Sequence, residues 1–222
     1  MQLIRENLYL VDGTEASHVY LLQLPNHTVL IDTCIPGKAD TILEECATLG
    51  IAPEQITDII LTHHDVDHLG NAAALRERCG AKLWVSPLDA PYVRRERRWL
   101  GIRRAMEVTI PWKVPEVDAL LTPGETLFGA VEVLATPGHT PGHISLLWED
   151  VLIAGDLVGT IRSKKPEDTV SLLPNFLTWN RAVLERSVRQ VGKRDFTWVC
   201  PGHGVPARRE DRWEALVAGF RK

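Results

Sequence analysis

The amino-acid sequence predicts an α+β fold in which β-sheets pack together and helices lie on the outside. Short apolar segments typical of strands alternate with segments of helical periodicity, and this alternation occurs in both halves of the chain. A length of 222 residues with 45% hydrophobic residues suits one domain with a sizeable core. We therefore expect a single domain spanning residues 1–222.

The first half begins with three strand-like segments and then alternates helices with strands. Residues 25–27 separate the second and third segments, as a hairpin turn does. Apolar residues from Ala39 to Leu49 recur at helical spacing, and Gly50 ends that run. The expected strands are 7–11, 18–24, 28–33, 57–62 and 82–85, and the expected helices are 39–50 and 71–80.

The second half repeats this pattern with more strands. Its expected elements are strands near 117–121, 126–136, 144–149, 150–155 and 196–200, and helices near 178–191 and 208–219. The charged stretch "RSKKPED" (162–168) is expected to be an exposed loop.

Residues 87–116 do not follow the alternation of strands and helices. We therefore expect an insertion here that forms a lid or a dimerisation surface. The sequence predicts a helix over 94–104 and a proline-rich loop over 110–117. Arginine side chains here could collect an anionic substrate, but charge runs usually face water, so a solvated helix face or contacts with a second subunit are favoured. These arginines are Arg94, Arg95, Arg97, Arg98, Arg103 and Arg104.

Composition excludes several classes of partner. The formal net charge of −4 does not suggest a nucleic-acid binder, and no apolar run reaches membrane-spanning length. Four widely spread cysteines form no CxxC pair, and no signal-peptide pattern precedes them. We therefore expect a cytoplasmic protein with free thiols that binds neither nucleic acid nor membranes.

Residues able to ligate metal follow strand ends at four places along the chain. "THHDVDH" (62–68) is the densest cluster, "TPGHTPGH" (136–143) and "IAGD" (153–156) come later, and "CPGHG" (200–204) is near the end. Clustered carboxylates repel one another unless a cation lies between them, and imidazole suits zinc, copper, iron and nickel. The candidates are His63, His64, Asp65, Asp67, His68, His139, His143, Asp156 and His203. For His18 and His27, which stand alone, a structural role is favoured.

The ordered motifs resemble the metallo-β-lactamase superfamily of hydrolases over nearly the whole chain, and "LIDT" (30–33) also matches the family's early strand, with Asp32 resembling a carboxylate that supports a ligand. The resemblance implies an αβ/βα sandwich of two mixed β-sheets with a dinuclear metal site at one edge. It assigns one ion to His63, position 65 and His139, and the other to Asp67, His68 and His203, with Asp156 bridging both. His143 is expected to support a ligand.

Asp65 departs from the family pattern, which has histidine at this position. Three interpretations remain: Asp65 ligates the first ion through oxygen, which is favoured; His64 replaces it; or the first ion is weak or missing. An anionic oxygen ligand would make iron or manganese more competitive with zinc.

The resemblance implies a metal-dependent hydrolase with two divalent ions, zinc being the first expectation. A metal-bridging hydroxide would cleave an ester, thioester, lactone or related bond of a small molecule, with Asp67 orienting the hydroxide and taking a proton. The alternative is an iron-dependent redox or sulfur- and oxygen-handling protein of the same fold. A homodimer is a further option.

Overall fold

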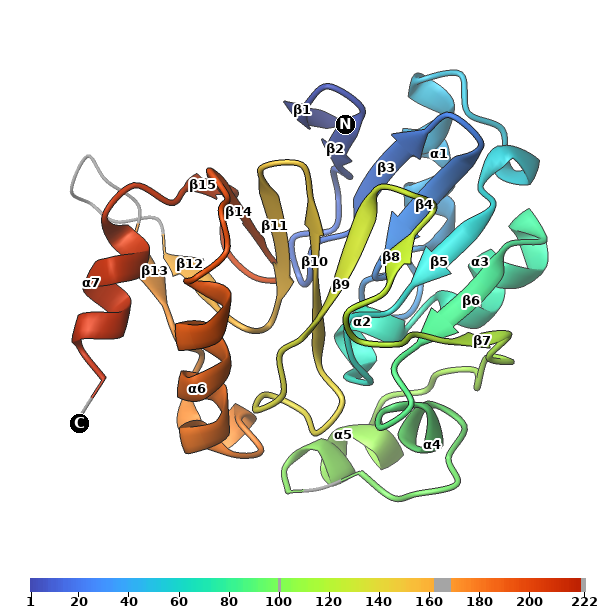
Figure 1. The fold of residues 1–222 in the computed structure, drawn as a ribbon. Helices are drawn as coiled ribbons and strands as arrows, with labels where there is room; N and C mark the ends of the chain where they lie inside the picture. The colour runs from blue at the N-terminus through green and yellow to red at the C-terminus, as the bar shows by residue number, and fades with distance from the viewer. Residues whose placement is uncertain (100, 162–168, 221–222) are drawn as a thin grey trace. The chain divides into compact units, whose positions relative to one another are not determined.

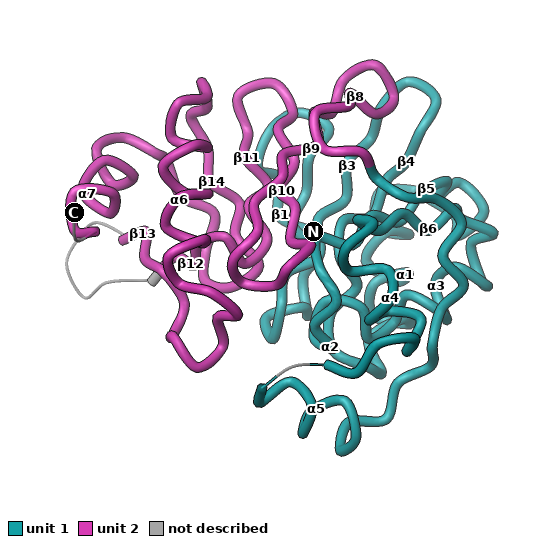
Figure 2. Tube along the Cα trace, turned by 60° about the horizontal axis from the view of Figure 1, so that its bottom comes forward, with its two compact units in different colours: residues 1–121 teal, residues 122–222 magenta. Residues whose placement is uncertain are grey.

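The computed structural model describes residues 1–99, 101–161 and 169–220 (Figure 1). The chain divides into two compact units, residues 1–121 and 122–222, which Figure 2 draws in different colours. Each unit contains one of the two larger β-sheets together with its own helices. The predicted α+β class with two mixed sheets is therefore confirmed, whereas the expectation of a single domain stays a prediction.

Unit 1 contains a seven-stranded sheet whose strands lie in chain order. They are β1 (Gln2–Arg5), β2 (Leu8–Leu10), β3 (Tyr20–Leu24), β4 (His27–Ile31), β5 (Asp58–Ile60), β6 (Lys82–Val85) and β7 (Ala119–Leu120). The first four strands form an antiparallel meander, and β4 to β7 are parallel. Because parallel strands carry their carboxyl ends to the same edge, the loops that follow β4, β5 and β6 begin side by side.

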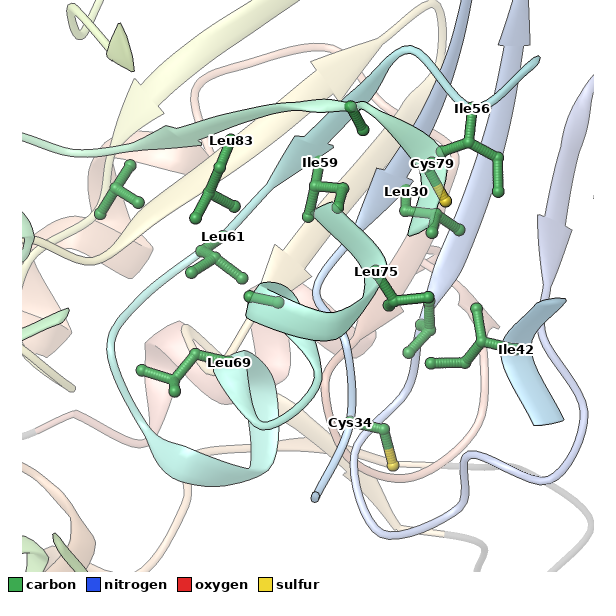
Figure 3. Close-up of a cluster of buried hydrophobic side chains, with 14 of the residues drawn as sticks. Leu30, Cys34, Ile42, Ile56, Ile59, Leu61, Leu69, Leu75, Cys79 and Leu83 are labelled. Carbon is green, nitrogen blue, oxygen red and sulfur yellow. The ribbon is translucent and has the colours of Figure 1, made fainter. Parts of the chain in front are cut away.

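The core of unit 1 lies between this sheet and the helices α1 (Ala39–Thr48) and α3 (Ala72–Cys79) (Figure 3). Both helices end at the glycines that the sequence indicated: Gly50 and Gly80 have φ of 73° and 66°, a left-handed conformation that glycine adopts without strain. The buried side chains of this cluster include Leu30, Ile42, Cys46, Ile59, Leu75, Cys79 and Leu83. Packing here fixes the strands whose ends carry polar residues.

Unit 2 contains a six-stranded sheet. Its order is β15 (Ala207–Arg208), β14 (Trp198–Pro201), β11 (Val151–Gly155), β10 (Ile144–Trp148), β9 (Val131–Ala135) and β8 (Thr126–Leu127). Strand β10 is antiparallel to both β9 and β11, and β11 is parallel to β14. Strands β9, β11 and β14 therefore run in one direction, and all three end at the same edge.

Helices α6 (Arg181–Val191) and α7 (Arg212–Ala218) complete the core of unit 2. Leu184 and Val188 of α6 are buried with Leu152 of β11 and Trp213 of α7. Helix α6 begins three residues after the predicted start at 178, because the Asn180 side chain accepts a hydrogen bond from the Val183 N–H (3.1 Å) and caps the helix there.

Some expected elements differ in the structure. The single strand expected over 126–136 is two strands, β8 and β9, because Phe128 and Gly129 have φ of 54° and 71° and reverse the chain. Strands β1, β12 (Gly159–Ile161) and β13 (Thr169–Ser171) were not predicted, since three or four residues are too few to show alternation. The expected loop 162–168 lies outside the described residues.

The insertion also differs from expectation. The helix predicted over 94–104 is wrong: α4 (Ala90–Val93) precedes it and α5 (Arg103–Thr109) begins at its end. Arg95 and Gly101 have φ of 57° and 59°, which an α-helix does not allow, so the chain turns between the two helices. The predicted loop over 110–117 is confirmed. Among the described helices, not one has the length and apolar character needed to span a membrane.

Candidate metal centre

The densest polar cluster of unit 1 lies at the end of β5, where the short helix α2 (Val66–Leu69) begins. Asp65 immediately precedes this helix, and its carbonyl accepts from the N–H groups of His68 and Leu69 (2.9 and 3.0 Å). His63 and His68 are buried, and Asp67 is half-buried. The sequence thus brings the four expected unit 1 residues, His63, Asp65, Asp67 and His68, into one loop and turn.

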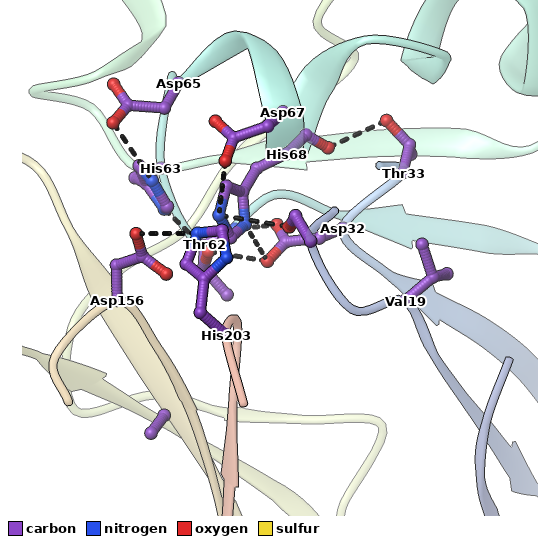
Figure 4. A network of polar contacts seen from close by, with 12 residues as sticks. Val19, Asp32, Thr33, Thr62, His63, Asp65, Asp67, His68, Asp156 and His203 are labelled. Atoms are coloured by element: carbon purple, nitrogen blue, oxygen red, sulfur yellow. Dashed lines mark hydrogen bonds and ion pairs between the residues drawn. The ribbon is translucent and has the colours of Figure 1, made fainter. Parts of the chain in front are cut away.

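Asp32, at the end of the neighbouring strand β4, fixes the orientation of His68 (Figure 4). Its carboxylate accepts from the backbone N–H and the hydroxyl of Thr62 (2.8 and 2.7 Å), and it lies 2.8 Å from His68 Nδ1. Because a carboxylate only accepts, Nδ1 of a neutral His68 is the protonated nitrogen and Nε2 carries the lone pair. This arrangement is typical of a metal-ligating histidine whose other nitrogen donates to a carboxylate.

His63 is oriented by the same network. The Thr62 hydroxyl uses its one hydrogen to donate to Asp32, so at His63 Nδ1, 2.9 Å away, it can only accept. Nδ1 of His63 is therefore the protonated nitrogen, and Nε2 carries the lone pair of that ring. The His63 and His68 rings lie side by side, with centroids 4.0 Å apart. The Ser17 hydroxyl, 3.1 Å from His68 Nε2, can donate to the lone pair of that ring.

The spacing of these atoms fits ligands of a metal ion. His63 Nε2 lies 3.6 Å from Asp65 Oδ2, and His68 Nε2 lies 3.8 Å from Asp67 Oδ2. Ligand distances of about 2.0–2.2 Å around a tetrahedral zinc ion place neighbouring ligand atoms roughly 3.4 Å apart. Both separations exceed those of ordinary hydrogen bonds and approach this value. The donor set and its geometry therefore fit a divalent ion.

His64 faces away from this cluster. Its Nδ1 lies 2.9 Å from Asp89 Oδ2, and its backbone N–H donates to the same oxygen at 3.1 Å. The ring also stacks on Tyr92, with centroids 4.5 Å apart. His64 thus contacts the segment that follows β6, and the interpretation in which it replaces Asp65 as a ligand has no support from its orientation.

Asp65 has a partner that the sequence did not indicate. Its Oδ1 accepts from Arg103 Nε at 2.5 Å, and both side chains are nearly buried. Sequence reasoning treated the six arginines of the insertion as one set, but only Arg103 among them is buried, while the other five are exposed. Helical spacing does not indicate this difference in burial, because Arg95 and Gly101, with φ of 57° and 59°, interrupt the helix that the spacing predicts.

Three polar residues converge in unit 2 because β9, β11 and β14 end at the same edge. His139 follows β9, Asp156 follows β11 and His203 follows β14. Asp156 Oδ2 lies 3.2 Å from His139 Nε2 and 3.4 Å from His203 Nε2, the latter contact being drawn in Figure 4. One carboxylate oxygen thus faces two imidazole nitrogens, while the bridging role expected of Asp156 stays a prediction.

His143 supports Asp156 through its backbone. The Asp156 N–H donates to His143 Nε2 at 2.9 Å, so Nδ1 carries the proton and donates to Thr136 Oγ1 at 2.8 Å. The Thr136 hydroxyl then donates to Ser145 Oγ (3.0 Å), which donates to the Ala154 carbonyl (3.0 Å). This directed chain of hydrogen bonds returns to β11, two residues before Asp156, and agrees with the expected supporting role of His143.

His18 and His27, the two histidines outside the ligand motifs, contact other side chains. His27 begins β4, at the opposite end of that strand from Asp32, and its Nδ1 lies 2.8 Å from Asp58 Oδ2. The His18 ring is buried and lies edge-on to Tyr20, with centroids 6.2 Å apart. Both agree with the structural roles that the sequence favoured.

Comparisons with known proteins identify a matching family model and several relatives of this chain. A family model described as the metallo-beta-lactamase superfamily matches residues 12–203. A probable metallo-hydrolase of Bacillus subtilis is 29% identical over 216 residues, covering 86% of this chain and 82% of the relative. A hydroxyacylglutathione hydrolase of Aeromonas hydrophila is 31% identical over 141 residues, but this match covers 63% of the chain and only 46% of that enzyme.

The fold also resembles solved structures. A metallo-beta-lactamase family protein from Thermus thermophilus matches with a TM-score of 0.72 at 24% identity, covering 97% of this chain and 80% of that one. At this level of identity the likeness concerns the fold, and it confirms the fold class that the sequence motifs implied.

Proposed function

Because the chain belongs to the metallo-beta-lactamase superfamily, we propose that it is a metal-dependent hydrolase of a small molecule. The bond cleaved is an ester, thioester, lactone or related bond. The observation that carries the proposal is the pair of oriented clusters, one in each unit. In both, imidazole Nε2 atoms face carboxylate oxygens at 3.2–3.8 Å.

The ligands that we propose for two divalent ions are those expected from the sequence. One ion takes His63, Asp65 and His139, and the other takes Asp67, His68 and His203, while Asp156 serves both. Zinc is the proposed metal, because imidazole nitrogens outnumber carboxylates in this set and zinc accepts both kinds of donor. When bound, the ions would lower the pKa of water towards neutrality and polarise the bond to be cleaved.

The protein's own residues have defined tasks in this proposal. Asp32 and Thr62 accept hydrogen bonds from the Nδ1–H groups of the two unit 1 histidines and so place the lone pairs of these rings on Nε2. His143 holds the backbone of Asp156. Asp67, the half-buried carboxylate of the cluster, is the proposed acceptor of a proton from the attacking water and its later donor to the leaving group.

A thioester is the first substrate class to test. The support is the likeness to a hydroxyacylglutathione hydrolase, a thioester hydrolase, although the chain spans less than half of that enzyme's length. We further propose that the substrate is a small molecule rather than nucleic acid or membrane lipid. A cytoplasmic location is proposed because Cys34, Cys46, Cys79 and Cys200 are all buried and free, as suits a reducing compartment.

The decisive experiment joins metal quantitation with a substrate screen. Purified protein is expected to contain about two zinc ions and to hydrolyse simple thioesters, esters or lactones. Asp67→Ala and His68→Ala are expected to abolish turnover and to lower bound metal, whereas His27→Ala, which removes a histidine paired with Asp58, should leave metal content unchanged. Full metal content and turnover in Asp67→Ala would contradict the dinuclear assignment. Bound iron with oxygen- or sulfur-dependent turnover would favour the redox alternative.

A further inference from the structure

The position at which the chain departs from the family pattern is occupied by a buried ion pair. Asp65 Oδ1 accepts from Arg103 Nε at 2.5 Å, and the exposed fractions of the two side chains are 13% and 7%. A buried charge without a partner is strongly unfavourable, so each member of such a pair depends on the other. The carboxylate and the cation are therefore one structural unit.

The two carboxylate oxygens of Asp65 face different partners. While Oδ1 holds the guanidinium, Oδ2 lies 3.6 Å from Nε2 of His63, the nitrogen that carries the lone pair. Oδ2 thus stays directed towards His63, the neighbouring candidate ligand. The hydrogen bond at Oδ1 restricts rotation of the carboxylate. Arg103 fixes the orientation of Asp65 as Asp32 fixes that of His68.

The arginine is held by the insertion. Arg103 begins α5, and the preceding loop is anchored by Trp99, whose indole N–H donates to the Tyr92 carbonyl (3.2 Å). Trp99 also stacks on Trp112 with centroids 5.5 Å apart, and Tyr92 stacks on His64. Adjacent residues 64 and 65 therefore both face the insertion, which places the cation at a defined position.

The net charge of the Asp65–Arg103 pair can be compared with that of the histidine in the family pattern. A neutral histidine ligand brings no net charge to a metal site, whereas an aspartate brings one negative charge. The guanidinium carries one positive charge at all physiological pH values. The Asp65–Arg103 pair is therefore net neutral, as the histidine of the family pattern is.

We propose that the Asp65–Arg103 pair acts as a charge-neutral substitute for that histidine, with Arg103 as a positioning residue for the ligand oxygen. The inference rests on the metal centre of the proposed function. It predicts that Arg103 offsets the preference for harder ions that an isolated carboxylate ligand would create, so that the site keeps a preference for zinc.

Four proteins test the proposal: the wild type, Asp65→His, Arg103→Met and the double variant Asp65→His/Arg103→Met. Arg104→Met is the matched control, because Arg104 is the exposed neighbour of Arg103. Dissociation constants for Zn²⁺ and Mn²⁺ are measured by competition with a chromophoric chelator, and the thermal midpoint is measured for each metal-free protein.

Asp65→His alone is expected to weaken zinc binding about tenfold or more, because it removes the carboxylate that neutralises the buried Arg103 cation. The double variant should recover most of this loss and should also recover the thermal midpoint. Arg103→Met should raise the Mn²⁺-to-Zn²⁺ affinity ratio about tenfold, since the carboxylate is then no longer neutralised. Arg104→Met should match the wild type.

A purely structural role for Arg103 gives a different pattern. The double variant would then be no better than Asp65→His in zinc affinity or thermal midpoint, and the metal ratio of Arg103→Met would equal that of the wild type; either result overturns the proposal. Should Arg103→Met fail to fold, Arg103→Lys, which keeps the cation, is expected to retain the wild-type ratio, and a changed ratio there would also refute it. Wild-type protein that binds no metal overturns the proposed function, whereas zinc-binding wild type without recovery in the double variant overturns this inference alone.

Discussion

Gly138, in the turn that carries His139, offers a test of how tightly the unit 2 cluster is built. Its φ is 137°, and a Cβ added there would lie 2.3 Å from Leu184 Cα and 2.4 Å from Leu184 N. Ordinary contact begins near 3.4 Å, so α6 would have to retreat by about 1 Å. Gly138→Ala is therefore expected to disturb both the turn and the helix.

The magnitude follows from two contributions. A non-glycine residue in this conformation costs about 1–3 kcal/mol, and overpacking against a helix backbone costs about 1–3 kcal/mol more. Together the two contributions give an expected loss of unfolding free energy of about 2–6 kcal/mol. Gly129→Ala is the matched control: its φ is 71°, nothing lies within 4 Å of its added Cβ, and its expected cost is about 1–2 kcal/mol.

Denaturant unfolding of the metal-free proteins, followed by tryptophan fluorescence, measures both variants. Metal content should also fall in Gly138→Ala, because the Trp179 N–H donates to the His139 carbonyl (2.9 Å) and the Asn180 N–H donates to the Gly138 carbonyl (2.9 Å), so the turn and the start of α6 move together. A loss in Gly138→Ala no greater than that in Gly129→Ala would refute the steric reasoning.

Three further predictions concern other parts of the molecule. Asp32→Asn removes the carboxylate that fixes His68 and should weaken metal binding about 10–100-fold without unfolding the protein, as chelator competition and circular dichroism will show. The guanidinium beside Asp118 lowers the pKa of that carboxyl, so its contribution to stability is present above its ordinary pKa and is lost as the pH falls through the lowered value. Asp118→Asn should therefore cost about 1–2 kcal/mol at pH 7 and progressively less below about pH 4, measured by urea unfolding against pH. Burial raises the pKa of Cys46 to about 12 and that of Cys79 to about 11, so native protein should resist alkylation at pH 8, and rapid native-state labelling at either thiol would contradict this.

The sequence predicted the position of each candidate ligand because strand ends are recognisable. An apolar run followed by a polar residue marked His63 after β5, Asp156 after β11 and His203 after β14. Parallel strands then bring those ends to a common edge of each sheet, so the grouping within each unit follows from topology. Metal identity and the ligand role of Asp65 stay predictions.

The partners of these residues were harder to predict. Nothing in the run of arginines distinguishes Arg103 from Arg104, because burial depends on the turn at Gly101 that precedes them. Likewise, pairing of His64 with Asp89 requires knowing that β5 and β6 are neighbours in the sheet. Such contacts arise from tertiary structure, and local sequence patterns contain no signal for them.

The hydrogen-bond chain through His143 has a consequence for how the protein acquires its metal. Since it begins at the Asp156 N–H and closes on the Ala154 carbonyl of the same strand, it holds the Asp156 backbone without help from an ion. Because protein groups alone make these hydrogen bonds, they reduce the conformational entropy that metal binding would otherwise have to remove from this loop. For the zinc centre proposed above, uptake by the metal-free protein should accordingly show no slow phase whose rate is independent of the zinc concentration.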